Sequence, residues 1–323
     1  MVSEHRQHTP RVALALGSGS ARGWAHIGII RALERAGVHP QVVAGTSIGA
    51  LVGAFYAAGK LDVLEPWVRK LTRRDVLGML DPTLRTTGGL IEGRRLHDFY
   101  QEHLAGASIE GLAMPYAAVA TTLGRGTEVW LRHGDLADAV RASSALPGVF
   151  SPVRRGGDWL VDGGLVNPVP VSVCRALDAD VVIAVNLNGD LVGRHMREGA
   201  HHTGSGVHPE RWLQQLPAGV RSHAQTLVGL WGDWTGARDA ERSEAPGVFE
   251  VLAGSLNIMQ DRITRSRMAG DPPELMLAPR LAHIGLLEFH RAEEAIGIGE
   301  AMVERMLPSI QDLLQSGAGD QVR

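Results

Sequence analysis

Cysteine and long apolar runs are scarce in this chain of 323 residues. Cys174 is the only cysteine, which excludes a disulfide within the chain and predicts a reducing compartment. Nowhere do apolar residues fill the ~18 positions that a membrane-spanning helix needs. Residues 1–10 are polar and lack the apolar core of a signal peptide. Together these absences predict a cytoplasmic protein.

An excess of one charge is also missing, because 35 acidic residues face 32 basic residues and the formal net charge is −3. A chain without a basic field has nothing to hold nucleic-acid phosphates, so nucleic acid is not expected as a partner. Any contact with an anionic membrane must then be local. One basic cluster could touch lipid headgroups, although such runs are more often solvated helix faces; it comprises Arg69, Lys70, Arg73 and Arg74.

Short apolar runs alternate with helical periodicity along the chain. Residues 12–16 form a continuous apolar run typical of a buried parallel strand, and residues 25–36 carry one apolar helical face that ends at Gly37. This alternation predicts an α/β fold with a mostly parallel central sheet and helices on both faces. Further strands are expected at 41–44, 116–122, 127–131, 159–161, 181–185 and 274–277, and further helices at 48–58, 135–142, 170–177 and 290–307.

Composition divides the chain into four segments. We expect an N-terminal tail over residues 1–10, a folded core over 11–190, a flexible loop rich in histidine and glycine over 191–208, and a helical region over 209–323 that completes or caps the core. No cysteine or carboxylate stands at ligand spacing from the loop histidines, so a solvated linker is favoured over a metal site. These histidines are His195, His201, His202 and His208.

The strongest motif is Gly45-Thr46-Ser47-Ile48-Gly49, which lies between a predicted strand and a predicted helix. A serine on such a sharp turn presents its hydroxyl to a ligand, and the flanking glycines let the backbone pass close to neighbouring elements. The helix that follows directs free N–H groups at the serine. Chance pentapeptides are common in a chain with 40 glycines, but this context favours a nucleophile at Ser47.

A glycine-rich loop, Gly17-Ser-Gly-Ser-Ala-Arg-Gly23, follows the first predicted strand. Its backbone amides could surround an anion. A dinucleotide site would need G-x-G-x-x-G and an acid at the end of the second strand, and neither is present. An oxyanion hole facing Ser47 is therefore favoured, with nucleotide binding kept as an alternative.

An acid closes the predicted strand at 159–161, in the run Asp162-Gly163-Gly164. Acids before paired glycines are often turn formers. Functional groups of open α/β sheets nevertheless gather at strand ends, which favours Asp162 as the base for Ser47. A triad would instead use a later histidine, either His283 or His290, although His283 and also His26 are expected to be structural.

These three motifs together resemble the patatin-like phospholipase family, in its bacterial and neuropathy-target-esterase-like branch. The resemblance covers residues 11–190, and the stretches 145–152 and 258–265 are also similar to family members. It implies a three-layer patatin-like fold, Ser47 as nucleophile, Asp162 as proton acceptor and an oxyanion hole at residues 18–20. The implied donors are Ser18, Gly19 and Ser20, and the supporting motif residues are Gly17, Arg22, Gly23, Gly45, Gly49, Gly163 and Gly164. Ser18 and Ser20 stand where the family has glycines.

The expected function is a serine hydrolase that cleaves carboxylic esters of phospholipids or lysophospholipids through an acyl-enzyme, without a cofactor or a metal. A non-catalytic scaffold that binds an acyl ligand or a partner is the alternative, because of the two serines in the glycine loop. The region 209–245 either contacts the inner membrane surface or packs as a subdomain. Its tryptophans are Trp212, Trp231 and Trp234.

Overall fold

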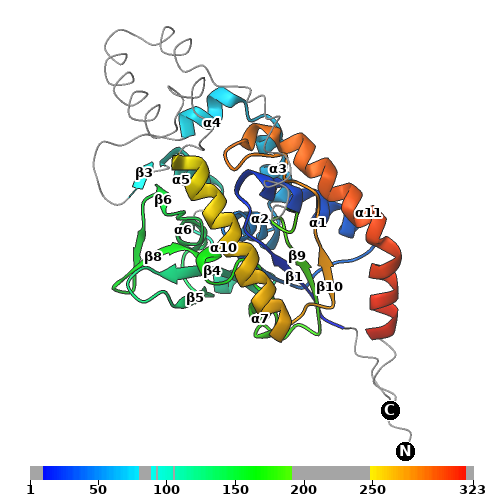
Figure 1. Cartoon of the computed structure of the whole chain (residues 1–323). Coiled ribbons are helices and arrows are strands. Elements are labelled where there is room, and N and C mark those ends of the chain that lie inside the picture. Colours follow the sequence, from blue (N-terminus) through cyan, green and yellow to red (C-terminus); the bar gives the residue numbers. More distant parts are fainter. Residues whose placement is uncertain (1–9, 80–88, 92–93, 105, 191–247, 318–323) are drawn as a thin grey trace, which may run out of the picture. The chain divides into compact units, whose positions relative to one another are not determined.

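The structure is a computed structural model that describes residues 10–79, 89–91, 94–104, 106–190 and 248–317 (Figure 1). The chain divides into two units, a main unit of residues 1–191 with 260–323 and a second unit of residues 192–259. Of the second unit, only residues 248–259 are described, as the first part of one helix. The expected loop at 191–208 and the region 209–245 lie outside the described residues.

The main unit contains an eight-stranded sheet in the order β10-β9-β1-β2-β4-β8-β7, with β5 also paired to β4. The pairs that join β10, β9, β1, β2 and β4 are parallel, and those of β5, β8 and β7 are antiparallel. The bounds are β1 Val12–Leu16, β2 Val42–Thr46, β4 Tyr116–Thr122, β5 Glu128–Leu131, β7 Val153–Arg155, β8 Asp158–Asp162, β9 Val181–Val185 and β10 Leu275–Leu277. A separate parallel pair joins β3 (Gly89–Ile91) to β6 (Gly148–Phe150).

Helices and short 3-10 turns connect these strands. The helices are α1 Ala25–Arg35, α2 Ile48–Ala57, α3 Leu61–Arg69, α4 Arg73–Met79, α5 Arg94–Leu104, α6 Leu136–Ser143, α7 Val171–Arg175, α10 Val248–Gly270 and α11 Ala292–Gly317. The 3-10 turns are η1 Ser20–Trp24, η2 Ile109–Gly111, η3 Gly163–Leu165 and η4 Phe289–Arg291.

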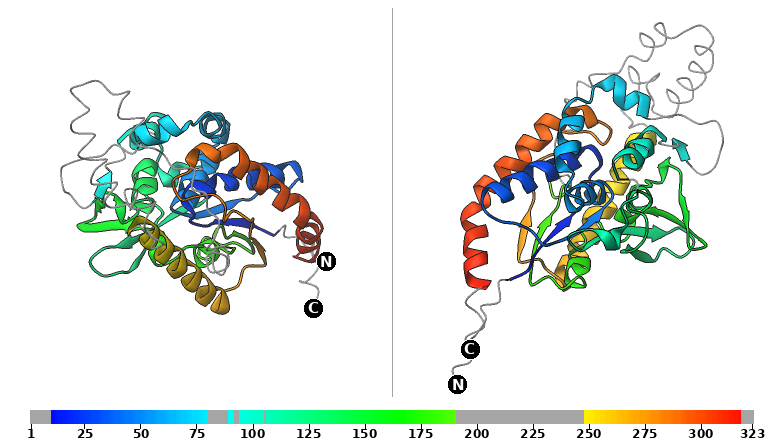
Figure 2. Two further views of the ribbon diagram at one scale, coloured as in Figure 1. Left: turned by 45° about the horizontal axis from the view of Figure 1, so that its top comes forward. Right: turned by 180° about the vertical axis from the view of Figure 1, so that it is seen from behind.

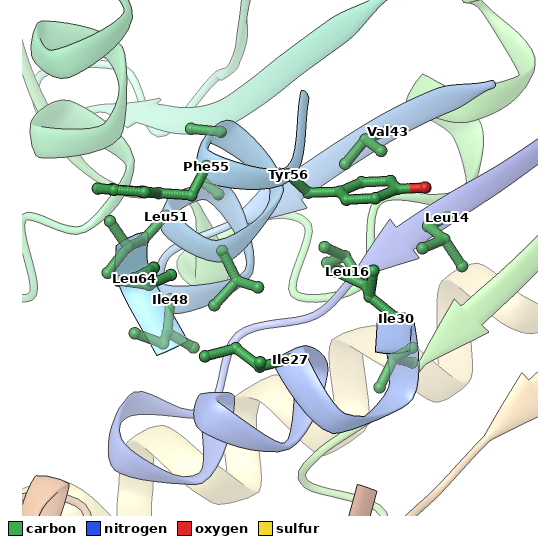
Figure 3. Close-up of a cluster of buried hydrophobic side chains, with 14 of the residues drawn as sticks. Leu14, Leu16, Ile27, Ile30, Val43, Ile48, Leu51, Phe55, Tyr56 and Leu64 are labelled. Carbon is green, nitrogen blue, oxygen red and sulfur yellow. The ribbon is translucent and has the colours of Figure 1, made fainter. Parts of the chain in front are cut away.

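Side-chain alternation along the central strands creates two cores, one on each face of the sheet. In β1, Leu14 and Leu16 join a large core with α1, α2 and α11, whereas Ala13 and Ala15 join a smaller core with α7. Figure 3 shows the large core between the sheet and its helices. Alternate residues of a strand point to opposite faces, so β1 is apolar throughout and fully buried. The predicted α/β sheet with helices on both faces is confirmed.

Helix α2 is buried along its whole length, because its sequence is apolar on every side. Helix α1 packs against α11 from the far end of the chain, and Figure 2 shows the two side by side. A Cβ at Gly28 of α1 would overlap the Ile296 carbonyl of α11, so the glycine permits this close approach. Strand β10 likewise joins the sheet beside β9.

Most predicted elements are present with shifts of one or two residues at their ends. The strands at 12–16, 116–122 and 181–185 have the predicted bounds. Strands β4 and β5 pair as an antiparallel hairpin. The helices between 61 and 104 were not predicted, because their apolar residues are spread among many charges. No described helix is long and apolar enough to cross a membrane.

Candidate active site

Ser47 lies at the junction of β2 and α2, with φ 58° and ψ −121°. This left-handed conformation is unfavourable for a residue with a Cβ, so the surrounding structure must hold it. The Ser47 N–H donates to Ser143 Oγ at 2.9 Å. Ser143 Oγ in turn donates to the Val119 carbonyl at 2.6 Å, which anchors the turn to β4. The side chain of Ser47 is half-buried and sits at the carboxyl end of a parallel strand.

The two glycines of the serine pentapeptide are needed for close packing. A Cβ at Gly45 would overlap the carbonyl oxygen of Gly49, and a Cβ at Gly49 would overlap the carbonyl of Leu16. The same Cβ at Gly49 would lie 2.7 Å from the Gly17 carbonyl oxygen. The start of α2 is therefore pressed against the end of β1, which places Ser47 beside the glycine loop.

Asp162 reaches Ser47 through the register of β4. Thr46 of β2 pairs with Val119, and Asp162 of β8 pairs with Ala120, the next residue of β4. Strand β5 pairs with Val119 and Ala120 along one edge of β4. Strands β2 and β8 must therefore both pair with the opposite edge of β4. They run in opposite directions along it, and their carboxyl ends therefore meet. The Ser47 side chain lies close enough to the Asp162 carboxyl group to act on its pKa as a hydrogen-bond donor.

The carboxyl group of Asp162 is buried, with 2% of the residue exposed. Burial raises its pKa from 3.8 to about 6, while the hydrogen bonds from the Ser47 side chain and the Gly164 N–H oppose this rise. The Gly164 N–H donates to Asp162 Oδ1 at 2.7 Å, which fixes the orientation of the carboxylate. A Cβ at Gly163 would overlap the Val119 carbonyl, so the turn after Asp162 also depends on a glycine.

The glycine loop follows β1 at the same edge of the sheet. The Gly17 N–H donates to the Val185 carbonyl at 3.1 Å, and the Ser18 N–H donates to the Pro168 carbonyl at 2.9 Å. The Ser18 amide is thus already engaged, which corrects the expectation that it would donate to an oxyanion. Within the described part of the chain, the amides of Gly19 and Ser20 make no hydrogen bond to another residue. Of the three amides expected to donate to an oxyanion, those of Gly19 and Ser20 therefore remain.

Ser20 has φ 52°, a conformation that costs a residue with a Cβ roughly 1–2 kcal/mol. Its hydroxyl donates to the Leu286 carbonyl at 2.6 Å, and the Ala21 N–H donates to the same oxygen at 3.2 Å. These two bonds tie the loop to the segment before α11. Ser20 stands where the family has a glycine, which adopts this conformation easily. Its side-chain hydrogen bond stabilises the serine in the same conformation.

Comparison with known proteins assigns the chain to a family. A family model described as patatin-like phospholipase matches residues 14–175, half of the chain. An uncharacterized NTE family protein of Mycobacterium tuberculosis is 35% identical over 94% of this chain and 93% of its own length. The chain belongs to the patatin-like phospholipase family.

Other relatives within the patatin-like family are much longer. Human patatin-like phospholipase domain-containing protein 6 is 35% identical over 54% of this chain but only 13% of its own length. Lysophospholipase NTE1 of Pyricularia oryzae is 27% identical over 93% of this chain and 19% of its own length. Among solved structures, VipD from Legionella pneumophila is similar with a TM-score of 0.45 and 12% identity, covering 93% of this chain and 67% of that chain.

Two further residues of the patatin-like glycine motif lie in η1. Arg22 is buried, and burial lowers its pKa to about 10, while the charge of Asp190 raises it. A Cβ at Gly23 would overlap the side chain of Ile48, the first residue of α2. The contact places η1 directly against the helix that follows Ser47.

Histidines hold structural positions in the described residues and none bonds to Ser47 or Asp162. The fully buried His26 of α1 has a ring Nε2 at 2.8 Å from the Gly17 carbonyl, and burial lowers its pKa to about 4. Since a carbonyl can only accept, the neutral ring donates and supports the glycine loop. His283 Nε2 contacts Glu294 at 2.9 Å and His290 Nε2 accepts from Arg73. The dyad is therefore favoured over a triad.

Sequence reasoning missed three side chains that hold the site together. Ser143 anchors the Ser47 amide, and Thr46 Oγ1 donates to the Asn167 carbonyl at 2.8 Å. Gln260, in the segment 258–265 that resembles family members, contacts the glycine loop through Ser18.

No group of histidine, cysteine and acidic residues in the described segments could hold a metal ion. Of the basic cluster, Arg69 is paired with Glu65 at 2.9 Å.

Proposed function

We propose that this protein is a serine lipid-ester hydrolase that cleaves carboxylic esters of phospholipids or lysophospholipids with Ser47 as nucleophile and Asp162 as base. The observation that carries the proposal is that the Ser47 side chain and a buried carboxylate meet where β2 and β8 end, next to a loop with two uncommitted amides. Family membership and the lysophospholipase and phospholipase names of relatives support lipid esters as the substrate class.

In the first half of the reaction, Ser47 Oγ attacks the ester carbonyl as Asp162 takes the hydroxyl proton. The carbonyl oxygen becomes an oxyanion beside the amides of Gly19 and Ser20. The tetrahedral intermediate collapses, the acyl group stays on Ser47, and the alcohol leaves with the proton that Asp162 returns.

The second half uses the same groups. Asp162 accepts a proton from water as the water oxygen attacks the acyl-enzyme, and the fatty acid leaves as the proton returns to Ser47 Oγ. Each oxyanion donor contributes roughly 2.7–4 kcal/mol to the transition state in hydrolases of this kind. The two amides therefore compensate for a base weaker than histidine.

Hydrolysis of short-chain and long-chain acyl esters by the wild type, Ser47→Ala and Asp162→Asn tests the proposal. Loss of either group is expected to lower kcat by roughly 10⁴-fold or more, because the two act as a unit. Circular dichroism of each variant checks that it is folded. A folded wild type without esterase activity would defeat the proposal and favour the non-catalytic scaffold.

A further inference from the structure

The segment 258–265 has no part in the reaction as proposed, yet three of its polar residues are buried, namely Gln260, Asp261 and Thr264. Gln260 is 5% exposed and Asp261 is 3% exposed, both in the part of α10 that belongs to the main unit. Asp261 Oδ2 accepts from Arg265 Nε at 2.8 Å within the same helix. Gln260 instead makes contacts outside its own helix. A buried amide with distant partners implies a specific role.

The side-chain oxygen of Gln260 joins two segments at the carboxyl edge of the sheet. It accepts from Ser18 Oγ at 3.1 Å and from Asn188 Nδ2 at 2.8 Å. Ser18 belongs to the glycine loop after β1, and Asn188 follows β9. Because Ser18 directly precedes Gly19, this bond fixes the loop that carries the two uncommitted amides.

The side-chain nitrogen of Gln260 lies against the loop of the base. A Cβ built at Gly164 would overlap Gln260 Nε2 and lie 3.0 Å from Asp162 Oδ1. Within the described residues, Nε2 makes no hydrogen bond, so it stays available next to this carboxylate. One amide group therefore touches both halves of the site, at Ser18 and at Gly164.

We propose that Gln260 is a positioning residue that sets the glycine loop and the Asp162 loop in one fixed geometry around Ser47. This inference rests on the proposed esterase function and assigns part of it to α10. The physical reason is that catalysis depends on placement, since a displacement near 1 Å can lower a rate roughly a hundredfold. Without Gln260, the glycine loop keeps its backbone bond to Pro168, but the side chain that links Ser18 to the turn at Gly164 is lost.

The first test compares Gln260→Ala, Ser18→Ala and the double variant on a short-chain ester. Gln260→Ala is expected to lower kcat roughly ten- to hundredfold with little change in KM, because the binding surface is kept and the reacting geometry is not. The double variant is expected to be no slower than Gln260→Ala alone, since both changes remove one interaction. Additive losses would overturn the coupling.

The second test uses Gln260→Glu, which keeps an oxygen for Ser18 and Asn188 and places a negative charge beside Asp162. The pKa of Asp162 is set by burial, the Ser47 side chain and the Gly164 N–H, with no charged group of the described residues acting on it. The charge of Asp190 acts on the pKa of Arg22. The new charge is expected to move the acid limb of kcat/KM upward by roughly one pH unit.

Asp261→Asn is the matched control, because it changes a buried polar residue of the same helix whose bond stays within that helix. It is expected to keep the wild-type kcat and acid limb. If Gln260→Ala fails to fold, Gln260→Glu decides the question by itself. If both Gln260 variants keep the wild-type kcat and the wild-type acid limb of kcat/KM, this inference is overturned and the esterase proposal stays intact. An inactive wild type would overturn both.

Discussion

At the scale of single residues, the chemistry depends on what burial does to one carboxyl group. In water an aspartate has a pKa near ~3.9 and is a poor acceptor for a hydroxyl proton. Burial raises the pKa of Asp162 to about 6, which makes its carboxylate more basic while it stays ionised near neutral pH. The Ser47 side chain and the Gly164 amide keep the ionised form oriented and limit the rise.

A pH dependence of activity follows from this pKa. The base must be ionised, so kcat/KM is expected to rise with pH through about 6 and to level above it. Initial rates on a short-chain ester from pH 3 to 8 measure this limb. A limb near pH 4 would contradict the raised pKa.

Ser47 and Ser20 show a second residue-scale feature, since both have positive φ at 58° and 52°. Strain of this kind is maintained only where neighbours supply compensating bonds. For Ser47 the neighbour is Ser143, and for Ser20 it is the Leu286 carbonyl. Of the three described non-glycine residues with positive φ, two are used in the proposed reaction, and the third is Asp178.

At the scale of elements, α1 supports the glycine loop through one buried imidazole. Replacing His26 with Ala leaves the Gly17 carbonyl without its donor and opens a cavity, so we expect a loss of about 2–4 kcal/mol in unfolding free energy. Replacing it with Gln keeps an N–H donor and is expected to cost less. Urea unfolding at pH 7.5 measures both variants.

The pH dependence of the His26→Gln comparison tests whether the ring is neutral. The pKa of His26 is lowered to about 4, so the unfolded chain binds a proton below its ordinary pKa of 6.5 while the folded protein does not. Stability from this group is present above pH 6.5 and is lost as pH falls toward 4. The advantage of wild type over His26→Gln is expected to shrink between pH 7.5 and 5. An advantage that does not change with pH would indicate a ring with an ordinary pKa.

The close packing of α1 against α11 depends on glycine. Two glycines of α11 provide a test and its control. A Cβ at Gly299 would overlap the Ala25 carbonyl, whereas a Cβ at Gly297 meets nothing within 4 Å. Gly299→Ala is expected to destabilise the protein by about 1–3 kcal/mol, since the helices must separate. Gly297→Ala is expected to stabilise it by about 0.5–1 kcal/mol through helix propensity. Thermal unfolding compares them, and equal effects would contradict the packing.

Some features of the fold and of the site can be predicted from local sequence patterns, and others cannot. The run Val12–Leu16 and the pentapeptide around Ser47 predict a strand end with a nucleophile, because apolar runs and glycine spacing are local signals. The use of the Ser18 amide by Pro168 could not be predicted, since it depends on a segment 150 residues away. The same holds for Gln260, whose partner Ser18 is 242 positions distant. Motif spacing predicts the proposed reacting groups, whereas the residues that hold them in place come from distant parts of the chain and are seen only in the tertiary structure.

At the scale of the whole molecule, residues 260–323 belong to the main unit. Strand β10 extends the sheet and α11 contributes buried side chains, namely Ala295, Ile296, Val303 and Ile310. A chain that ends at residue 291 would leave the face of α1 uncovered. It is expected to lose cooperative unfolding, measured by calorimetry. Cooperative unfolding with the wild-type midpoint would contradict the assignment of α11 to this core.

The central claim is that Ser47 is a nucleophile activated by Asp162, and covalent labelling tests it most directly. A fluorophosphonate reacts with an activated serine, and mass spectrometry of the digested protein locates the adduct. The account predicts one adduct at Ser47 in the folded wild type, none in Ser47→Ala, and much slower labelling in Asp162→Asn. Folded wild-type protein that stays unlabelled, or is labelled equally fast without the Asp162 carboxylate, would contradict it.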